Sequence, residues 1–324
     1  MNPPSGAGLV LRFAVLALAW GCSFLFIKVA LEGLSPSQVV LGRVLIGAVT
    51  LALVVSAGRV PLPRGGRVWG HLLVIGLFLC VIPFMLFAVA ETSIASGLAS
   101  IYNATTPLLT ALVAILALPG ERLSRRAGAG LAVGFLGVLV VVGIPVGAQA
   151  GDDASLAGQL MCLGATACYG IGFVWIRRFI SPLGLPAASV AFAQVGLAAV
   201  VALVVAPFTA LQPMSLNLPV VLSVIALGAL STGLAYIWNT EIVAGWGATS
   251  AASVTYLTPV VGVVAGVLVL GETFSWNQPA GGVLVVLGVV LTKMPLRRIS
   301  RRRRAQGPDA GREQMRGRSG YGVQ

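Results

Sequence analysis

Charged side chains are scarce in this sequence. Asp, Glu, Lys and Arg together make up 9% of its 324 residues, whereas an ordinary soluble domain has about 25%. Hydrophobic residues make up 57% of the chain, and its mean hydropathy is +0.97. A chain with so few charges has too little polar surface for an ordinary soluble globule. The composition therefore favours a protein embedded in a membrane.

Several chemical signatures are also missing. The four cysteines form no CxxC pair and no Cys/His spacing typical of a metal or redox site, so we expect no metal or cofactor. No GxxxxGK[ST] loop occurs, which argues against ATP hydrolysis by a P-loop. The chain has one histidine, His71, and neither HExxH nor GxSxG. Because no acidic residue lies at the centre of a hydrophobic run either, an enzyme is not expected.

Long hydrophobic runs fill most of the sequence instead. Runs of about 20 residues can each cross a bilayer as a helix, whereas a transmembrane barrel would show short alternating segments. Ten such runs can be marked, at residues 11–31, 37–57, 71–90, 98–118, 128–147, 157–176, 187–207, 219–239, 249–270 and 278–292. The sequence therefore predicts an all-α integral membrane protein with ten transmembrane helices.

Positive charge falls on one set of connections between these runs. If the first run starts in the cytoplasm, 19 of the 21 Lys and Arg lie in cytoplasmic segments, and only Lys28 and Arg43 fall elsewhere. The opposite connections hold acidic residues and no cation. Lys and Arg in short loops set orientation. We therefore expect a multi-pass protein of the plasma or inner membrane with both termini in the cytoplasm.

The segment 293–324 is strongly basic. Ten Lys and Arg lie in it, against two acidic residues. We expect a disordered cytoplasmic tail that contacts anionic lipid headgroups. Its single tyrosine does not provide the interleaved aromatic side chains of a nucleic-acid site, so no nucleic-acid partner is expected.

The sequence contains an internal repeat. Residues 20–28 read WGCSFLFIK, and residues 169–177 read YGIGFVWIR. Further along, residues 99–121 (ASIYNATTPLLTALVAILALPGE) correspond to residues 251–272 (AASVTYLTPVVGVVAGVLVLGE). Both of these longer segments place Thr-Pro in mid-helix and end on Gly-Glu. We interpret the Gly-Glu turns as structural.

The repeat predicts two domains, 1–147 and 156–292, of five helices each. Five is an odd number, so the second copy must enter the membrane in the opposite direction. Inverted repeats are a common construction of secondary transporters, whose substrate site lies near the midplane between the two halves.

These motifs resemble the drug/metabolite transporter superfamily, specifically the EamA family. The resemblance rests on the WGxxFxxxK opening, Arg43, the TP-containing fourth run, the GE turn before GLAVGFLGVLVVV and the duplicated layout, and it covers residues 11–292. It implies a ten-helix carrier with helices 1–4 and 6–9 around a central cavity and helices 5 and 10 peripheral. It also implies metabolite transport, often export of amino acids or related solutes. One departure is Gln194, which stands where the first copy has Arg43.

Arg43 is the strongest candidate for a substrate contact. It lies inside the second run, and a charge within the membrane normally faces a cavity or a partner. It would bind a carboxylate or phosphate through its planar fork. The alternatives are a structural pair with Glu91 or with freed carbonyls, or a side chain that reaches outward to the interface.

Three further charged residues are candidates for gating or coupling. Lys28 lies four residues before Glu32, so the two share a helix face; it is either an interfacial anchor or a gate charge. Glu91 and Glu241 precede the two TP-containing runs. Each either lies on a solvated face or, if partly buried, binds a coupling proton.

The helix breaks define the remaining cavity candidates. Matching Pro107 and Pro259 each remove a backbone hydrogen bond, and such breaks in both halves mark a transporter's site. Polar side chains near these breaks and one deep tyrosine are expected to line the cavity: Tyr102, Asn103, Thr106, Tyr236, Tyr256 and Thr258. Neighbouring threonines could instead satisfy the freed backbone groups.

The function expected from the sequence is secondary transport. We expect export of a small metabolite, such as an amino acid or related amphipathic solute, by alternating access with proton antiport. An intramembrane enzyme acting on lipid and an accessory membrane subunit are the alternatives. The sequence leaves open whether the chain works alone or as a homodimer.

Overall fold

A computed structural model of the chain describes residues 6–117, 125–142, 155–246 and 254–293. Within these ranges every regular element is a helix, which confirms the all-α prediction. Seven helical stretches are long and apolar enough to cross a membrane: Ala7–Ala30, Pro36–Ala57, Gly66–Ala90, Ser96–Ala117, Leu156–Leu183, Ala187–Thr209 and Leu218–Asn239. Three shorter apolar helices cover Gly128–Val141, Leu257–Leu270 and Asn277–Leu291. The predicted tail, apart from Lys293, lies outside the described residues.

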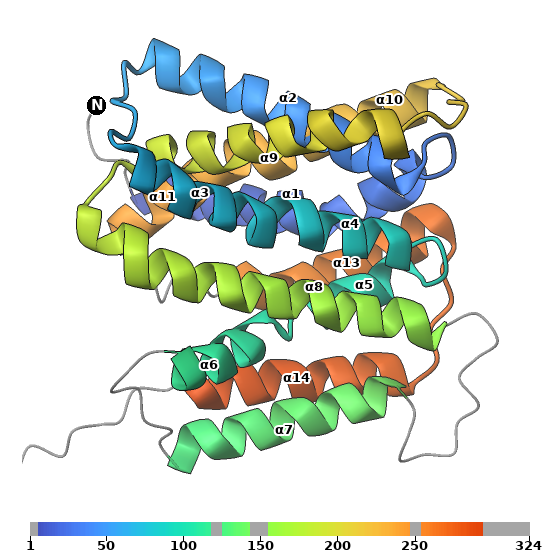
Figure 1. The fold of residues 1–324 in the computed structure, drawn as a ribbon. Helices are drawn as coiled ribbons and strands as arrows, with labels where there is room; N and C mark the ends of the chain where they lie inside the picture. The colour runs from blue at the N-terminus through green and yellow to red at the C-terminus, as the bar shows by residue number, and fades with distance from the viewer. Residues whose placement is uncertain (1–5, 118–124, 143–154, 247–253, 294–324) are drawn as a thin grey trace, which may run out of the picture. The chain divides into compact units, whose positions relative to one another are not determined.

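The first half of the chain contains α-helices and one π-helical segment within the described residues (Figure 1). In order these are α1 (Gly6–Ala30), α2 (Pro36–Ala57), α3 (Gly66–Gly76), the π-helical segment η1 (Leu77–Val81), α4 (Ile82–Ala90), α5 (Ser96–Asn103), α6 (Thr106–Ala117) and α7 (Arg125–Val142). The segments α3, η1 and α4 form one continuous stretch, whereas α5 and α6 are separated by two residues in a turn.

The second half has a similar layout. It contains α8 (Leu156–Trp175), the π-helical η3 (Ile176–Ile180), the short η4 (Ser181–Leu183), α9 (Ala187–Thr209), α10 (Leu218–Ile225), the π-helical η5 (Ala226–Leu234), α11 (Ala235–Trp246), α13 (Val254–Leu270) and α14 (Asn277–Lys293). Here α10, η5 and α11 form one stretch, as α3, η1 and α4 do in the first half.

Two helix ends differ from the sequence prediction because charged residues obscured them. The third stretch begins at Gly66 rather than at His71, after Gly65 at a φ of 95°. The sixth stretch continues through Arg177 and Arg178 and ends before Gly184, at a φ of 60°. Only glycine adopts such left-handed angles readily, so both boundaries are fixed by backbone geometry rather than by hydropathy.

At one end of the helical assembly, described residues that lie between helices hydrogen-bond across the chain. The amide of Ser215 donates to the Gly33 carbonyl (2.9 Å), and the amide of Ser155 donates to the Ser93 carbonyl (3.4 Å). The Glu272 carboxylate accepts the Ser96 amide (2.6 Å). We call this the acidic end, because Glu32, Glu91 and Glu272 lie between helices there.

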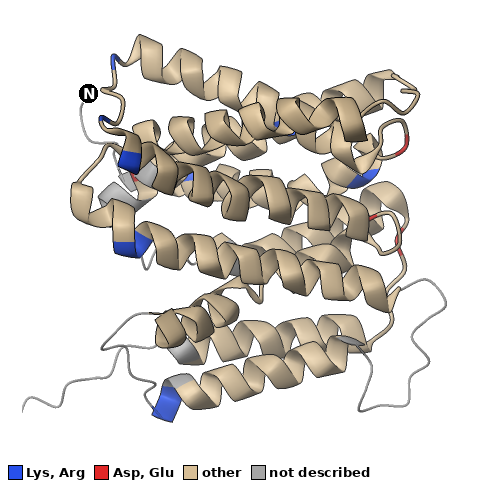
Figure 2. Cartoon of the chain, viewed as in Figure 1, with Lys and Arg blue, Asp and Glu red and all other residues tan. Residues whose placement is uncertain are grey.

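The opposite end carries most of the described cations (Figure 2). Contacts across the chain bring its members together: Arg178 donates from Nη1 to the Ala117 carbonyl (3.0 Å), and His71 stacks on Phe179 with ring centroids 4.5 Å apart. We call this the basic end; its described cations are Arg12, Arg59, Arg64, Arg67, Arg125, Arg126, Arg177 and Arg178. Helix α1 runs from the basic end to the acidic end, and α8 runs in the opposite direction.

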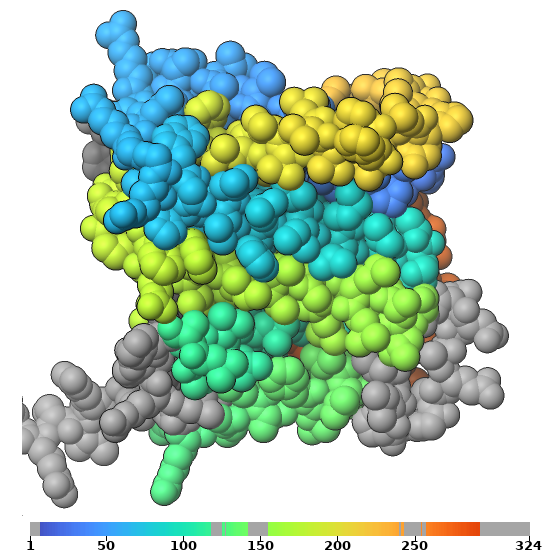
Figure 3. All heavy atoms as spheres, in the orientation of Figure 1, coloured from blue at the N-terminus to red at the C-terminus, as the bar shows by residue number. Residues whose placement is uncertain are grey.

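The helices pack through apolar side chains and close glycine contacts. On the face shown in Figure 3, α8 lies along η1 and α4, where Gly172 meets Leu79. Helices α7 and α14 pair with each other at one edge of the bundle (Figure 1). Their backbones approach so closely that a Cβ on Gly288 would lie 2.5 Å from the Gly134 Cα.

Candidate functional site

Arg43 lies buried among helices from both halves of the chain, with 8% of its surface exposed. Its Nε donates to the Thr232 hydroxyl (2.9 Å), and its guanidinium carbon sits 3.7 Å from the centroid of the Phe84 ring. The alternative of a structural pair with Glu91 is therefore not what the structure shows. Within the described ranges, neither terminal nitrogen of Arg43 has a hydrogen-bond partner, and no carboxylate forms an ion pair with it.

Thr232 is oriented by the π-helical geometry of η5. Its hydroxyl donates to the carbonyl of Leu227, five residues earlier (2.9 Å), so its oxygen is left to accept from Arg43. π-Helical turns are frequent at functional sites. The equivalent segment η1 carries Cys80, which is buried and lies near Arg43.

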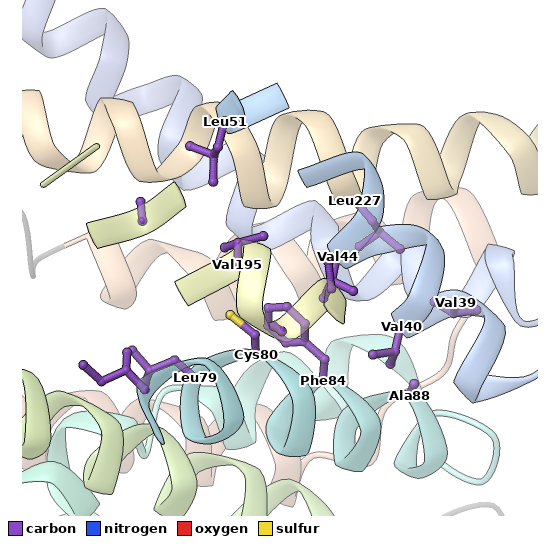
Figure 4. Close-up of a cluster of buried hydrophobic side chains, with 14 of the residues drawn as sticks. Val39, Val40, Val44, Leu51, Leu79, Cys80, Phe84, Ala88, Val195 and Leu227 are labelled. Carbon is purple, nitrogen blue, oxygen red and sulfur yellow. The ribbon is translucent and has the colours of Figure 1, made fainter. Parts of the chain in front are cut away.

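Two tyrosines complete the surroundings of the guanidinium. Tyr169 of α8 and Tyr236 of α11 lie close to Arg43 and pack against the buried cluster that contains Cys80 and Phe84. We call Arg43, Cys80, Phe84, Tyr169, Thr232 and Tyr236 the central cluster. Buried aliphatic side chains of α2, α9 and η5 pack beside Cys80 and Phe84 (Figure 4). The cluster thus offers a buried cation among aromatic and hydroxyl groups.

A second polar cluster occupies the acidic end. The Lys28 ammonium donates to the carbonyls of Glu91 (2.6 Å) and Ile94 (2.8 Å), so it caps the C-terminus of α4. Glu32, which the sequence placed on the same helix face, lies beyond the end of α1, and within the described residues it forms no ion pair with Lys28. A cation at a helix C-terminus is favoured by the helix dipole. Lys28 is therefore part of the packing between α1 and the α4–α5 turn.

Glu272 performs the complementary role on the next helix. Its carboxylate accepts the backbone amides of Ser96 (2.6 Å) and Gly97 (3.0 Å) at the N-terminus of α5. This arrangement satisfies two amides that a helix cannot pair internally. The structural interpretation of this Gly-Glu turn is confirmed, and its equivalent Glu121 lies outside the described residues.

Glu91 and Glu241 precede equivalent segments of the sequence, but they differ in burial and in the end of the molecule at which they lie. Glu91 has no exposed surface, so the predicted solvated face is wrong for this residue. Glu241, at the basic end, accepts from Arg12 Nε (2.9 Å) and keeps about a quarter of its side chain exposed. The two candidates lie at opposite ends and do not form one site.

The residues of the first helix break line a packing interface instead of joining Arg43. Tyr102 is buried and donates to Gln159 Oε1 of α8 (2.5 Å). Thr106 donates to the Asn103 carbonyl (2.8 Å), across the turn that separates α5 from α6. Pro107 stands at the start of α6, so the predicted break is confirmed here. The threonine bonds correspond to the alternative in which hydroxyls satisfy freed backbone groups.

The second TP segment does not break. Helix α13 is continuous through Pro259, and Thr258 is buried within it. Tyr256 lies in the same helix, but its side chain is outside what the structure describes. The prediction of matching breaks is therefore correct for the first half and wrong for the second.

Sequence reasoning missed three members of the central cluster. Phe84 and Cys80 were indistinguishable from ordinary apolar packing residues, and Thr232 sits in a glycine- and alanine-rich run. Their only signal was position, because Cys80 and Thr232 fall at equivalent places in the third and eighth predicted helices. Of the predicted candidates, the structure brings together Arg43 and Tyr236. The sixth member, Tyr169, is the first residue of the repeated motif at 169–177.

The fold and the central cluster describe a multi-pass helical membrane protein with a buried cation between its halves. The sequence profile of the EamA-like transporter family matches residues 8–143 and again residues 156–294. The chain belongs to this family of membrane transporters and is a protein of the cell membrane.

Relatives of known name are distant but cover nearly the whole chain. It is 26% identical to the uncharacterized transporter YdfC of Bacillus subtilis, over 90% of this chain and 93% of that protein. It is 25% identical to a probable amino-acid metabolite efflux pump of Salmonella typhimurium, over 86% of this chain and 92% of the relative. A similarly named Escherichia coli pump is also 25% identical, over 87% and 94%.

A solved crystal structure has the same fold. It superposes with a TM-score of 0.63 at 21% identity, covering 89% of this chain and 97% of that one.

Proposed function

We propose that this protein is a secondary transporter that exports a small amphipathic metabolite carrying a carboxylate, such as an amino acid derivative. The observation that carries the proposal is Arg43, a buried cation whose two terminal nitrogens have no partner within the described chain. Such a fork matches a carboxylate in a bidentate fashion. An uncompensated buried charge is costly, and a bound anion would remove that cost.

The other members of the central cluster suggest the chemistry of the rest of the substrate, beyond its carboxylate. Phe84, Tyr169 and Tyr236 present aromatic rings around the guanidinium. Aromatic side chains with a polar handle suit ligands that are partly apolar. Two of the relatives bear the name probable amino-acid metabolite efflux pump, which agrees with a small zwitterionic solute.

Inverted repeats, with ten crossings in all, are part of the proposal, and two pairs of equivalent glycine contacts support them. Gly21 of α1 faces Val261 of α13 so closely that a Cβ on the glycine would overlap the valine side chain. Gly170, its equivalent in α8, faces Leu109 of α6, the equivalent of Val261. The duplicated aromatic-glycine dipeptide therefore makes the same helix crossing twice. The opposite directions of α1 and α8 agree with inversion.

The second pair of contacts lies beside the central cluster. Gly228 of η5 approaches the Arg43 carbonyl, and Gly76, its equivalent at the end of α3, approaches the Gln194 carbonyl. Helix α2 of the first half thus packs on Gly228 of the second half, and α9 of the second half packs on Gly76 of the first. Because one crossing carries arginine and the other glutamine, a single anionic group would be held off the two-fold axis.

The cytoplasmic position of both termini is supported by the separation of charge. The basic end collects the described arginines other than Arg43, and among the described residues the acidic end holds one cation, Lys28, which is engaged with carbonyls. The positive-inside rule therefore places the basic end in the cytoplasm. Alternating access would open the central cluster to each end in turn, driven by exchange with protons.

Transport rather than catalysis is proposed because the central cluster lacks an acid–base pair. The one histidine, His71, stacks on Phe179 at the basic end, away from Arg43 in the helical bundle. General acid–base chemistry requires such groups within hydrogen-bond reach of a reacting atom. The aromatic and cationic groups that are present suit binding.

The test is transport by the purified protein in proteoliposomes loaded with a radiolabelled amino-acid mixture. We expect accelerated exchange by the wild type and at least a tenfold loss in Arg43→Gln, which installs the residue of the other half. Charge-assisted hydrogen bonds are worth about 1.5–3 kcal/mol each, and 1.4 kcal/mol is about tenfold in affinity. The matched control is Arg67→Gln, which removes an exposed arginine. Equal exchange by Arg43→Gln and the wild type would contradict the role of Arg43.

A further inference from the structure

Glu91 is an unusual residue because its carboxylate is buried and unpaired. It follows the last residue of α4 and has no exposed surface. Neither carboxylate oxygen has a hydrogen-bond partner within the described ranges. The nearby Lys28 ammonium uses two donors on the carbonyls of Glu91 and Ile94 instead of on the carboxylate.

Charged and titratable groups face Glu91 from four other parts of the chain. Lys28 belongs to α1, Arg43 to α2, Cys162 to α8, and Glu272 follows α13. Glu272 is held by the amides of α5 and adds negative charge near Glu91. The surroundings thus include two cations that favour an ionised carboxylate, one anion that opposes it, and complete exclusion from water.

Burial dominates this balance. It raises the pKa of the Glu91 carboxyl well above its ordinary range; Lys28 opposes the rise, Glu272 adds to it, and Arg43 opposes it. An ionised carboxylate without hydrogen bonds would incur a large desolvation cost. A protonated carboxyl would not, so the arrangement seen at the acidic end fits a neutral Glu91.

We propose that Glu91 is the proton-binding group of the transport cycle: it holds a proton while the acidic end is closed, and exchanges that proton with water when the end opens. The proposal rests on the transport function proposed above. In the exchange, one O–H bond forms or breaks on a Glu91 carboxyl oxygen, and water accepts or supplies the proton. The state with a closed acidic end therefore binds one more proton than the open state, so a lower pH favours the closed state.

Lys28 connects the protonation of Glu91 to the position of the α4–α5 turn. When Glu91 is neutral, the ammonium is free to cap α4 and join α1 to the α4–α5 turn. When Glu91 is ionised, its carboxylate competes for the same ammonium, and admitting water at this end lowers the cost of the charge. The α4–α5 turn is therefore the element whose position the proton controls.

Infrared spectroscopy of the purified protein tests this assignment without a substrate. A protonated carboxylic acid has a C=O stretching band that a carboxylate and an amide lack. We expect the band at neutral pH in the wild type, its loss in Glu91→Gln, and its disappearance from the wild type at high pH. Glu32→Gln, which alters an exposed acid at the same end, should retain the band. A wild type without the band at neutral pH, or a band unchanged in Glu91→Gln, would overturn the proposal.

Proteoliposomes separate this proposal from the function on which it rests. With a radiolabelled amino-acid mixture, we expect an imposed pH gradient to accelerate exchange by the wild type and by Glu32→Gln but not by Glu91→Gln. A variant still accelerated by the gradient would overturn the role of Glu91. A wild type that exchanges nothing would count against the proposed function, while the infrared result would still decide whether Glu91 is protonated.

Discussion

At the scale of single residues, the protein places three charges where the membrane makes them unfavourable. Arg43 is stacked on a ring and bonded to one hydroxyl, Lys28 is bonded to backbone carbonyls, and Glu91 has no side-chain hydrogen bond within the described chain. The second caps a helix, and we propose that the first binds an anion and that the third binds a proton. Substitutions at these positions should therefore have different consequences.

Glu91 should make stability depend on pH. A raised pKa means that the folded protein binds more protons than the unfolded chain between the ordinary pKa of glutamate and the raised value. Stability should therefore fall as pH rises through that window, by at most about 1.4 kcal/mol per pH unit for one proton. Thermal unfolding at a series of pH values should show this slope in the wild type. Glu91→Gln should flatten it, and a slope unchanged in that variant would contradict the assignment.

Lys28 should matter for stability whether or not substrate is bound. Lys28→Met removes the two charge-assisted bonds to the carbonyls of Glu91 and Ile94. We expect a loss of about 1.5–3 kcal/mol, seen as a lower thermal midpoint in detergent. Arg59→Met, which removes an exposed cation at the basic end, is the control and should leave the midpoint nearly unchanged. Equal midpoints for the two variants would identify Lys28 as a simple interfacial anchor.

At the scale of helices, close contacts at glycine and π-helical turns set the site. Helix η5 orients Thr232 through a carbonyl five residues earlier, and η1 places Cys80 near Arg43. The turn between α5 and α6 is stabilised by threonine hydroxyls. These departures from regular α-helix lie in the stretches that meet between the two halves.

Gly21 should be intolerant of a side chain. An alanine Cβ there would overlap the Val261 Cβ and lie 3.2 Å from the Thr258 carbonyl oxygen. Overpacking of this kind costs about 1–3 kcal/mol, so Gly21→Ala should lower the thermal midpoint. Gly196→Ala, within α9 and with nothing inside 4 Å, should keep or raise it because alanine favours helix. Similar midpoints for the two variants would show that the α1–α13 crossing is not close.

The sequence predicted the helices and part of the site for physical reasons that can be stated. Hydrophobic runs reveal helices, and the duplicated aromatic-glycine motif marks equivalent crossings. The sequence did not reveal Thr232 or Phe84 as partners of Arg43, because those contacts join segments far apart in the chain. Nor did it reveal the π-helical segments, whose hydrogen-bond shift leaves no mark in composition. Pro259 was misjudged because α13 accommodates the proline without a break.

At the scale of the whole membrane protein, charge separation implies a fixed orientation. At the acidic end, described residues between helices hydrogen-bond across the chain, and the described arginines other than Arg43 lie at the basic end. Lys and Arg in short cytoplasmic loops determine which way such a chain inserts. We therefore expect the connection 210–217 to lie outside the cell and the connection 58–65 to lie inside.

Cysteine labelling tests this orientation directly. Met214 and Arg64 are both exposed, one in each connection. A membrane-impermeant thiol reagent should label Met214→Cys in intact cells and should label Arg64→Cys only after the membrane is permeabilised. The unmodified chain, whose four cysteines are buried or partly buried, provides the background. The reverse pattern would show that the orientation is inverted.

We propose that Arg43 holds the carboxylate of a small exported metabolite. The most direct measurement is the thermal midpoint of the purified protein against matched pairs of ligands, each an amino acid and its amide. A ligand at 100 times its dissociation constant should add about 2.7 kcal/mol of stability. We expect at least one acid to raise the midpoint of the wild type, its amide to leave the midpoint unchanged, and Arg43→Gln to respond to neither. An amide as effective as its acid, or an undiminished shift in Arg43→Gln, would contradict it.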